Sequence, residues 1–363
     1  MTNSTARSNA GNAAPLRVAL IVNSSTPGGA ESYLYRLYGG LVKRGLVEVT
    51  LIGQLPDWPA ELGPVIPAGT AAKLTRREPL LPQLRKSLTN ARAVRRVLKE
   101  QAFDLVHMQY FREKLVLPGY FTTGLPVLWT EHGPLAPNFP RAGLPFLRMR
   151  AGRSTIMAVS EAVRESFAEV NITSEIVWNP LPEASSGRPV RQEGRTSDYV
   201  LYAGRVHNSK RLSLLLDAAR MAPDVQVKIA GDGPDLAVLR ESAPSNVKFL
   251  GHLSDLGDLM AGCLAVVSTS GREAREGSPM VVLEARNLGV PVLMAEDCHA
   301  AEEARGLGAN IYAPAAEALA AEIQALGGTL RTKPLAGDER ERRGESRWLA
   351  DTYGVMERTA QRR

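Results

Sequence analysis

Short apolar runs alternate along the chain with segments whose apolar residues recur at helical spacing. The run 17–22 ends at a glycine-containing loop, and Leu34, Leu37 and Leu41 then follow at helical spacing before Gly45. A strand, a loop, a helix and a next strand at 47–52 predict a βαβ unit. We expect further strands at 103–108, 126–130, 155–159 and 175–178, and helices at 30–45, at 88–100 and after the N-cap residue Ser160.

The alternation is interrupted once. Two prolines in the sequence Asn179-Pro-Leu-Pro end regular structure, and the polar stretch 183–198 with its Gly and Pro is typical of a linker. Beyond it we expect strands at 199–203, 225–230, 247–250, 264–268 and 290–295, and helices at 212–221, 236–242 and 280–287. The chain is therefore predicted to be α/β, with a disordered lead (1–15), two Rossmann-like doubly wound domains (16–182 and 199–335) joined by the linker 183–198, and a helical tail (336–363).

Composition narrows the class of protein. Two cysteines, Cys263 and Cys298, are too few for a disulfide framework or a cysteine-based zinc site, and they suit a reducing cytosol. The polar opening segment lacks the apolar stretch of a signal peptide, and no run approaches the roughly 18 apolar residues of a membrane span. We therefore expect a cytoplasmic protein.

The net charge of +6 is unevenly distributed. Between Lys73 and Lys99 nine basic residues face Glu78 alone, with Leu80, Leu81, Leu84 and Leu88 among them, and four arginines lie between 141 and 153 without an acid. This pattern fits a solvated helix face, and it equally fits docking of 73–99 on the inner face of an anionic membrane or on an acidic acceptor.

Basic residues follow a strand at the start of the second half. Arg205 and Lys210 come directly after the strand expected at 199–203. Ligands of doubly wound sheets bind at the carboxyl ends of the strands, so these cations suit a diphosphate. The alternative is a pair of solvated surface charges. The later turn Gly231-Asp-Gly233 lacks the third glycine of a dinucleotide fingerprint, since Leu236 stands there.

Two glutamates flank a loop-to-helix junction. Glu276 precedes Gly277, Ser278 and Pro279, and the main-chain N–H groups at the start of the next helix form an anion site. Glu284 follows inside that helix between apolar neighbours, where a carboxylate needs a partner such as a sugar hydroxyl.

Five residues of the first half also follow strands. Gly28 and Gly29 would let a ligand lie against the main chain, or they form an ordinary turn. His132 is suited to hydrogen bonding near neutral pH, or it is a satisfied structural histidine. His107 and Gln109 present a similar, weaker case.

Together these motifs resemble the retaining glycosyltransferases of family 4, which have the GT-B architecture, from about residue 17 to 294. The resemblance assigns Arg205 and Lys210 to the donor diphosphate and Glu276 and Glu284 to the family's E-x7-E signature. In that signature the first glutamate meets the sugar hydroxyls and the second meets the ribose hydroxyls. The resemblance further implies that Gly277, Ser278, Pro279 and Met280 contact the donor. It also implies that the segment 247–253, which ends at Leu253, contacts the nucleobase through its main chain.

The resemblance extends to the first half and the tail. Gly28 and Gly29 match the glycine loop that faces the diphosphate, His132 matches a histidine near the reacting centre, and the tail with Trp348 looks like a helix that packs back across both domains. Two segments depart from the family pattern: the start of the linker, Asn179-Pro-Leu-Pro, and the unusually charged segment 272–275. The charged segment is a candidate for altering which sugar is selected.

The implied reaction is transfer of a hexosyl or aminohexosyl group from a nucleoside-diphosphate sugar to a hydroxyl or amine, with retention at the anomeric carbon. No cofactor beyond the donor and no obligatory metal is implied. UDP, GDP or dTDP donors and natural-product, polysaccharide or lipid-linked acceptors all remain open.

Three other classes compete with this interpretation. A nucleotide-sugar 2-epimerase shares the two-domain build. A nicotinamide-dependent oxidoreductase is disfavoured, because the G-x-G-x-x-G that it would need is missing after the strand that ends at Val22. A nucleic-acid-binding module is disfavoured, because no helix-turn-helix signature, zinc finger or basic–aromatic interleaving is present.

Overall fold

The computed structural model describes residues 14–25, 28–68, 80–181, 198–253, 255–326, 335 and 337–362. Most of the expected lead 1–15 and of the expected linker 183–198 lies outside these residues, as do Lys73, Arg76 and Arg77 of the basic stretch. The linker therefore stays a prediction.

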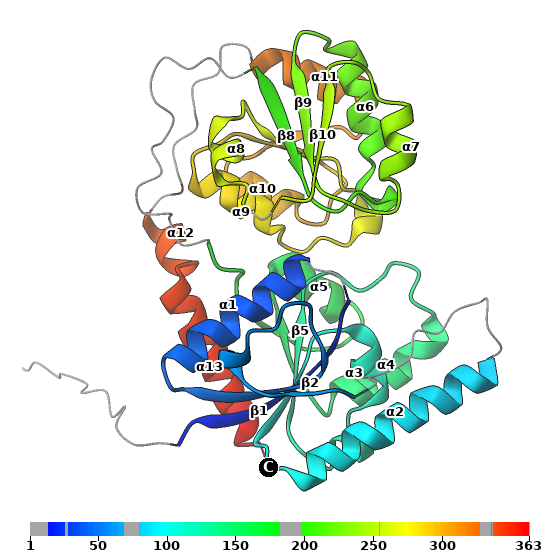
Figure 1. Ribbon diagram of the computed structural model, residues 1–363, viewed down its shortest axis with the longest axis vertical. Coiled ribbons are helices and arrows are strands. Elements are labelled where there is room, and N and C mark those ends of the chain that lie inside the picture. The colour runs from blue at the N-terminus through cyan, green and yellow to red at the C-terminus, as the bar shows by residue number, and fades with distance from the viewer. Residues whose placement is uncertain are drawn as a thin grey trace, which may run out of the picture. The chain divides into compact units, whose positions relative to one another are not determined.

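Each predicted half forms a sheet (Figure 1). The first has the order β3-β2-β1-β4-β5-β6-β7, and β1 pairs in parallel with β2 and β4. Its strands are β1 (Leu16–Asn23), β2 (Val47–Gln54), β3 (Val65–Ile66), β4 (Leu105–Met108), β5 (Val127–Glu131), β6 (Thr155–Ala158) and β7 (Glu175–Ile176).

The second sheet has the order β10-β9-β8-β11-β12-β13, with parallel pairing throughout. Its strands are β8 (Tyr199–Ala203), β9 (Gln226–Ala230), β10 (Val247–Gly251), β11 (Val266–Ser268), β12 (Val292–Ala295) and β13 (Asn310–Tyr312). In both sheets the strand order reverses beside the first strand of the half, as in doubly wound folds.

Helices follow most strands, as a parallel sheet requires. Those of the first half are α1 (Gly29–Lys43), α2 (Leu80–Glu100), α3 (Phe111–Val116), α4 (Leu144–Ala151) and α5 (Glu161–Ala168). The later helices are α6 (Leu212–Met221), α7 (Leu236–Glu241), α8 (Gly257–Gly262), α9 (Met280–Asn287), α10 (Ala301–Gly306), α11 (Ala316–Ala325), α12 (Gly337–Arg342) and α13 (Glu345–Ala360).

Alternate residues of the second sheet supply two cores. Val200 and Tyr202 of β8 pack with apolar residues of α6 and α11 on one face. Tyr199 and Leu201 point to the other face, where residues of α8, α9 and α10 cover them. Helices lie on both faces of this sheet (Figure 1), and burial on both faces explains why the strand is a continuous apolar run.

The chain divides into two compact units. One comprises Met1–Trp129, Arg153–Thr155 and Tyr353–Arg363, and the other comprises Thr130–Gly152 and Ile156–Thr352. The long helix α13 therefore contributes its first turns to the second unit and its last turns to the first. Trp348 of this helix, which the resemblance pointed to, and its neighbour Leu349 are each 1% exposed.

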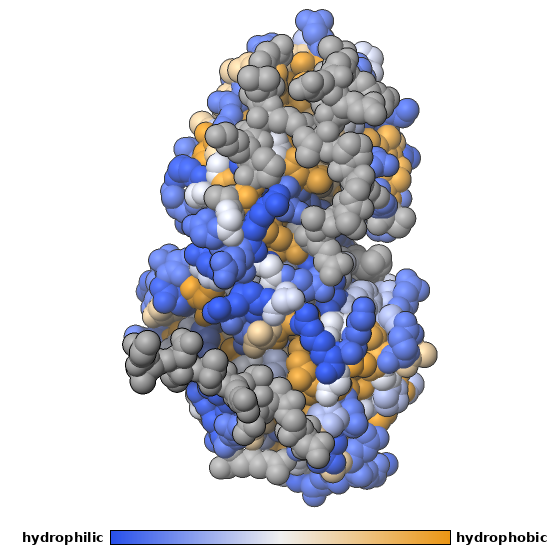
Figure 2. Space-filling model, turned by 90° about the vertical axis from the view of Figure 1, so that its left-hand side faces the viewer, coloured by the Kyte–Doolittle hydropathy of each residue, from blue (hydrophilic) through white to orange (hydrophobic). Residues whose placement is uncertain are grey.

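The described surface is predominantly polar where Figure 2 shows it, with smaller hydrophobic areas between hydrophilic residues. In the described part of the chain, no helix combines the length and apolar character that a membrane crossing requires.

One helix is longer than the sequence pattern predicts. The helix expected at 88–100 begins at Leu80. Pro82 lies in its first turn, where main-chain N–H groups have no partner within the helix, so the proline is tolerated there. The predicted N-cap is confirmed: the Ser160 hydroxyl accepts a hydrogen bond from the Val163 N–H group at 3.4 Å.

Candidate functional site

The turn after β8 carries the two predicted diphosphate ligands. Arg205 is exposed at this turn, and its carbonyl accepts a hydrogen bond from the Tyr202 hydroxyl at 3.0 Å. Lys210 ends a short 3₁₀ turn over Asn208–Lys210, and its carbonyl accepts from the Thr269 hydroxyl at 2.5 Å. These contacts fix the main chain of the turn while both cationic side chains extend from it.

A neighbouring turn explains the glycines at 231–233. The Val206 N–H group donates to the Asp232 carbonyl at 2.9 Å, so the turns after β8 and β9 touch through their main chains. A Cβ atom on Gly231 would lie 1.8 Å from the carbonyl oxygen of Gly204, and its φ of +149° also favours glycine. Close packing of two turns thus accounts for this glycine.

Lys210 and Glu276 meet although 66 residues separate them. The Lys210 ammonium is hydrogen-bonded and ion-paired to the Glu276 carboxylate. Their side chains are only 19% and 20% exposed, so the pair is partly shielded from water. Two residues that the sequence analysis assigned to the donor site therefore lie together at the carboxyl end of the second sheet.

The loop containing Glu276 also contacts His132. The Gly277 N–H group donates to the His132 carbonyl at 3.2 Å, and Arg275 Nε donates to the Pro134 carbonyl at 2.7 Å. A Cβ on Gly277 would lie 2.4 Å from Val163 Cγ2 and 2.7 Å from the His132 oxygen, so only glycine fits there. Burial lowers the pKa of Arg275, which nearby Glu131 partly offsets.

The loop leads into α9 without a side-chain cap. Pro279 is the N-cap residue of this helix and offers no capping side chain, so its first turn retains the anion-attracting character of a helix start. Met280 and Glu284 lie on α9 and are both half-buried, and Ser278 is buried. Leu253 follows β10 and is 36% exposed.

Three residues that support this site could not be identified from sequence motifs. Arg211 donates to both carboxylate oxygens of Asp297, at 2.8 and 2.7 Å, and through Nε to the Thr269 carbonyl at 2.8 Å. Thr269 directly follows β11 and Asp297 follows β12, so their position after strands was the available signal. Cys298 lies beside this pair, and burial raises its pKa to about 12, with the charge of Glu276 as the second cause.

In the first unit, the predicted glycine loop begins α1. Gly28 is the N-cap residue and Gly29 the first residue of the helix. The Gln109 side chain donates to the Ala30 carbonyl at 2.6 Å, and the Tyr110 hydroxyl is hydrogen-bonded to buried Glu31. Gln109 was among the candidates identified from the sequence, whereas Glu31 and Tyr110 were not.

His107 has a structural role. Its Nδ1 lies 2.7 Å from the Tyr38 hydroxyl, and both residues are fully buried. A buried polar pair of this kind satisfies itself within the core.

Among the described residues, no three His, Cys, Asp or Glu side chains are grouped as metal ligands. The expectation of a reaction without metal or cofactor stays a prediction.

Two family models match adjacent parts of the chain. The model described as Glycosyltransferase Family 4 matches residues 27–182, and the model described as Glycosyl transferases group 1 matches residues 187–327. The second of these contains Arg205, Lys210, Glu276 and Glu284. Comparison with curated proteins finds no match.

Solved structures share the fold along nearly the whole chain. A glycosyltransferase from Rickettsia africae ESF-5 has a TM-score of 0.74 at 16% identity, covering 96% of this chain and 100% of that one. HepE from Anabaena, in complex with UDP, has a TM-score of 0.70 at 21% identity, covering 94% and 100%. WaaG, a glycosyltransferase involved in lipopolysaccharide biosynthesis, has a TM-score of 0.66 at 18% identity, covering 95% and 98%. The two adjacent family matches place the chain among the glycosyltransferases of the family 4 type, and the solved structures show that it has their GT-B fold.

Proposed function

We propose that this glycosyltransferase moves a hexosyl or aminohexosyl group from a nucleoside-diphosphate sugar to a hydroxyl or amine of its acceptor, with retention at the anomeric carbon. The observation that carries the proposal is the Lys210–Glu276 pair beside the uncapped start of α9. A cation, a carboxylate and a helix start are grouped there, as a sugar diphosphate requires.

The charges of the site suit departure of a diphosphate. In the structure Glu276 neutralises Lys210, and an arriving diphosphate would compete for the Lys210 ammonium and leave Glu276 to accept hydrogen bonds from sugar hydroxyls. Arg205 supplies a second cation from the same turn. Together with the start of α9, these groups stabilise the negative charge that develops on the leaving phosphate. We therefore propose that neither a metal ion nor a separate cofactor is needed.

The proposed transfer occurs on one face of the sugar. The bond between the anomeric carbon and the phosphate oxygen breaks, the acceptor oxygen or nitrogen bonds to the same face, and the departing phosphate takes the acceptor proton. Glu284 is proposed to bind the ribose hydroxyls, the 277–280 main chain the sugar and phosphate, and the segment ending at Leu253 the nucleobase. His132, whose carbonyl holds Gly277, is proposed to lie near the reacting centre.

A ligand panel tests the donor assignment. Sugar conjugates of UDP, GDP and dTDP are compared by thermal shift with NAD and NADP, and we expect stabilisation by one nucleoside-diphosphate class only. Stabilisation by NAD(P) alone would favour an oxidoreductase. Conversion of the donor to its C2 epimer without acceptor would identify an epimerase, and an inverted anomeric configuration in the product would refute retention.

We further propose peripheral contact of α2 with anionic membranes on the cytoplasmic side. From Leu80 to Lys99 this helix contains no acidic residue, and Leu88 is 44% exposed. Its exposed cations are Arg85, Lys86, Arg92, Arg96 and Lys99. The charge and the exposed leucine suit the surface of an anionic bilayer. Cosedimentation with phosphatidylglycerol vesicles at low salt tests this contact, and absence of binding there would support a solvated helix face.

A further inference from the structure

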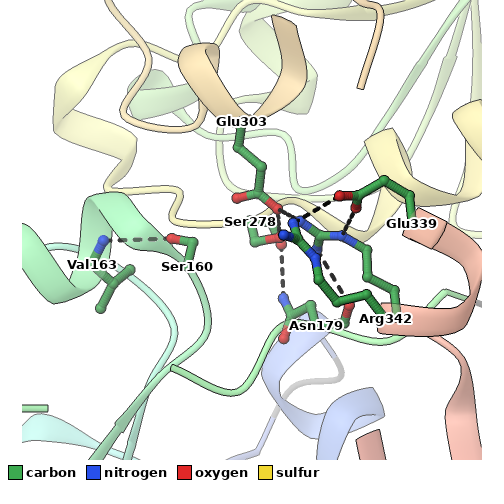
Figure 3. Close-up of polar contacts among 8 residues, drawn as sticks. Ser160, Val163, Asn179, Ser278, Glu303, Glu339 and Arg342 are labelled. Atoms are coloured by element: carbon green, nitrogen blue, oxygen red, sulfur yellow. Dashed lines mark hydrogen bonds and ion pairs between the residues drawn. The ribbon is translucent and has the colours of Figure 1, made fainter. Parts of the chain in front are cut away.

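A buried polar cluster joins the tail to the loop before α9 (Figure 3). Arg343 lies between α12 and α13 and is 1% exposed. Its Nη2 donates to Glu303 Oε1 at 2.8 Å, and its Nε donates to Glu339 Oε2 at 3.1 Å. Removing an arginine from water to this extent is costly unless carboxylates pair with it. The burial of Arg343 therefore depends on these two glutamates.

Glu303 connects Arg343 to Ser278, because one carboxylate oxygen binds both side chains. The Ser278 hydroxyl donates to the same Oε1 atom at 2.7 Å, and the Ser278 carbonyl accepts from Asn179 Nδ2 at 2.9 Å (Figure 3). Ser278 is 6% exposed and Asn179 is 4% exposed. The hydroxyl and the carbonyl of Ser278 are thus both held within the protein, while its main-chain N–H group takes part in neither contact.

Arg343 also holds the segment that carries Asn179. Its Nη1 donates to the Asn179 carbonyl at 3.4 Å, and its own carbonyl accepts from the Leu181 N–H group at 2.8 Å. Leu181 also packs in a small apolar cluster with Leu283 of α9. One arginine of the tail therefore contacts both residues whose side chains hold Ser278: it pairs with the Glu303 carboxylate and donates to the Asn179 main-chain carbonyl.

We infer that Arg343 is a positioning residue for the donor-binding loop: through Glu303 and Asn179 it sets the conformation of Ser278 and of the 277–280 main chain. Arg343 itself contacts none of the residues that are proposed to bind the donor. The inference rests on the proposed function only in what the loop binds. Because a main-chain anion site depends on the direction of its N–H groups, a small rotation of Ser278 would weaken donor binding.

Hydrogen–deuterium exchange tests the positioning role without any ligand. In Arg343→Lys the charge is kept, but the guanidinium fork that spans Glu303, Glu339 and Asn179 is lost. We expect exchange of the 276–283 segment to accelerate about tenfold. Arg342→Lys is the matched control, because Arg342 pairs with Glu339 at 2.9 Å and is 46% exposed. Its exchange over 276–283 should stay within about twofold of the wild type.

Glu303→Gln provides a second route if Arg343→Lys does not fold. It keeps the shape and the acceptor for Ser278 but removes the charge that holds Arg343, and it should also accelerate exchange over 276–283. Unchanged exchange in both variants, or equal acceleration in Arg343→Lys and Arg342→Lys, overturns the inference.

Kinetics separate positioning from a merely structural role. We expect Arg343→Lys to raise the donor KM about tenfold, and to raise it by a smaller factor in a Ser278→Ala background, where the contact with Glu303 is lost and only the contact with Asn179 remains. A merely structural role predicts a lower Tm with an unchanged donor KM, which would overturn the inference. If the wild-type protein neither binds nor uses any nucleoside-diphosphate sugar, the proposed function fails, whereas the exchange comparison still decides the role of Arg343.

Discussion

Replacing Lys210 by alanine removes the cation that is ion-paired with Glu276 in the structure. At a site this shielded, with an effective dielectric constant of about 20, two unit charges 4 Å apart interact by about 4 kcal/mol. Loss of one group that stabilises developing charge costs about 100- to 1000-fold in turnover in comparable sites. We therefore expect Lys210→Ala to lower kcat by a factor in this range.

The assay is initial-rate transfer with the donor identified by the ligand panel, measured at saturating acceptor. Thermal unfolding shows whether the variant is folded, and Lys43→Ala, at the exposed end of α1, is the control for loss of a lysine elsewhere. Lys210→Arg keeps the charge and should retain more activity than Lys210→Ala. Turnover of Lys210→Ala within about threefold of the wild type would refute the role of this cation, since a leaving-group contact is worth far more.

Three further outcomes follow from the structure. Gly277→Ala should destabilise the protein by about 1–3 kcal/mol, because the added Cβ would overlap Val163 and His132. The control is Gly39→Ala, which has open space around its Cβ and should be neutral or stabilising. Thermal unfolding compares the two variants, and equal Tm values would contradict the steric reasoning. Cys298, whose pKa burial raises to about 12, should react with iodoacetamide at pH 8 about a thousandfold more slowly than an ordinary thiol, as mass spectrometry of the labelled peptide can measure. Transfer should persist in excess EDTA, and loss of activity that Mg²⁺ or Mn²⁺ restores would show that a metal ion is required.

Long elements could be predicted closely from the sequence. The strand at 199–203 and the helices at 212–221 and 280–287 have the predicted bounds in the structure. Apolar spacing and flanking Gly or Pro residues define such elements. Short elements were not predicted, among them α8 (Gly257–Gly262), α10 (Ala301–Gly306) and β13 (Asn310–Tyr312), because three to six residues contain too few periods to distinguish helix from strand.

The donor side of the candidate site was predictable for a topological reason. Parallel strands bring their carboxyl ends to one edge, which made the loops after strands the candidate positions for ligand contacts, and Lys210 after β8 and Glu276 after β11 are in contact there. Arg343 could not be predicted in this way. It stands in the arginine-rich segment 340–343, and its sequence context does not distinguish it from exposed Arg342. Only the tertiary contacts with Glu303 and Asn179 give it a separate role.

The contact between the turns after β8 and β9 also constrains the lengths that these two turns can have in related sequences. Because the Val206 N–H group bonds to the Asp232 carbonyl and Gly231 abuts Gly204, neither turn has room for an extra residue while the other keeps its length. Insertions in the two loops should therefore occur together or not at all among sequences that share this arrangement. Loop exchange aimed at new donor preferences would accordingly have to replace both turns as a single unit.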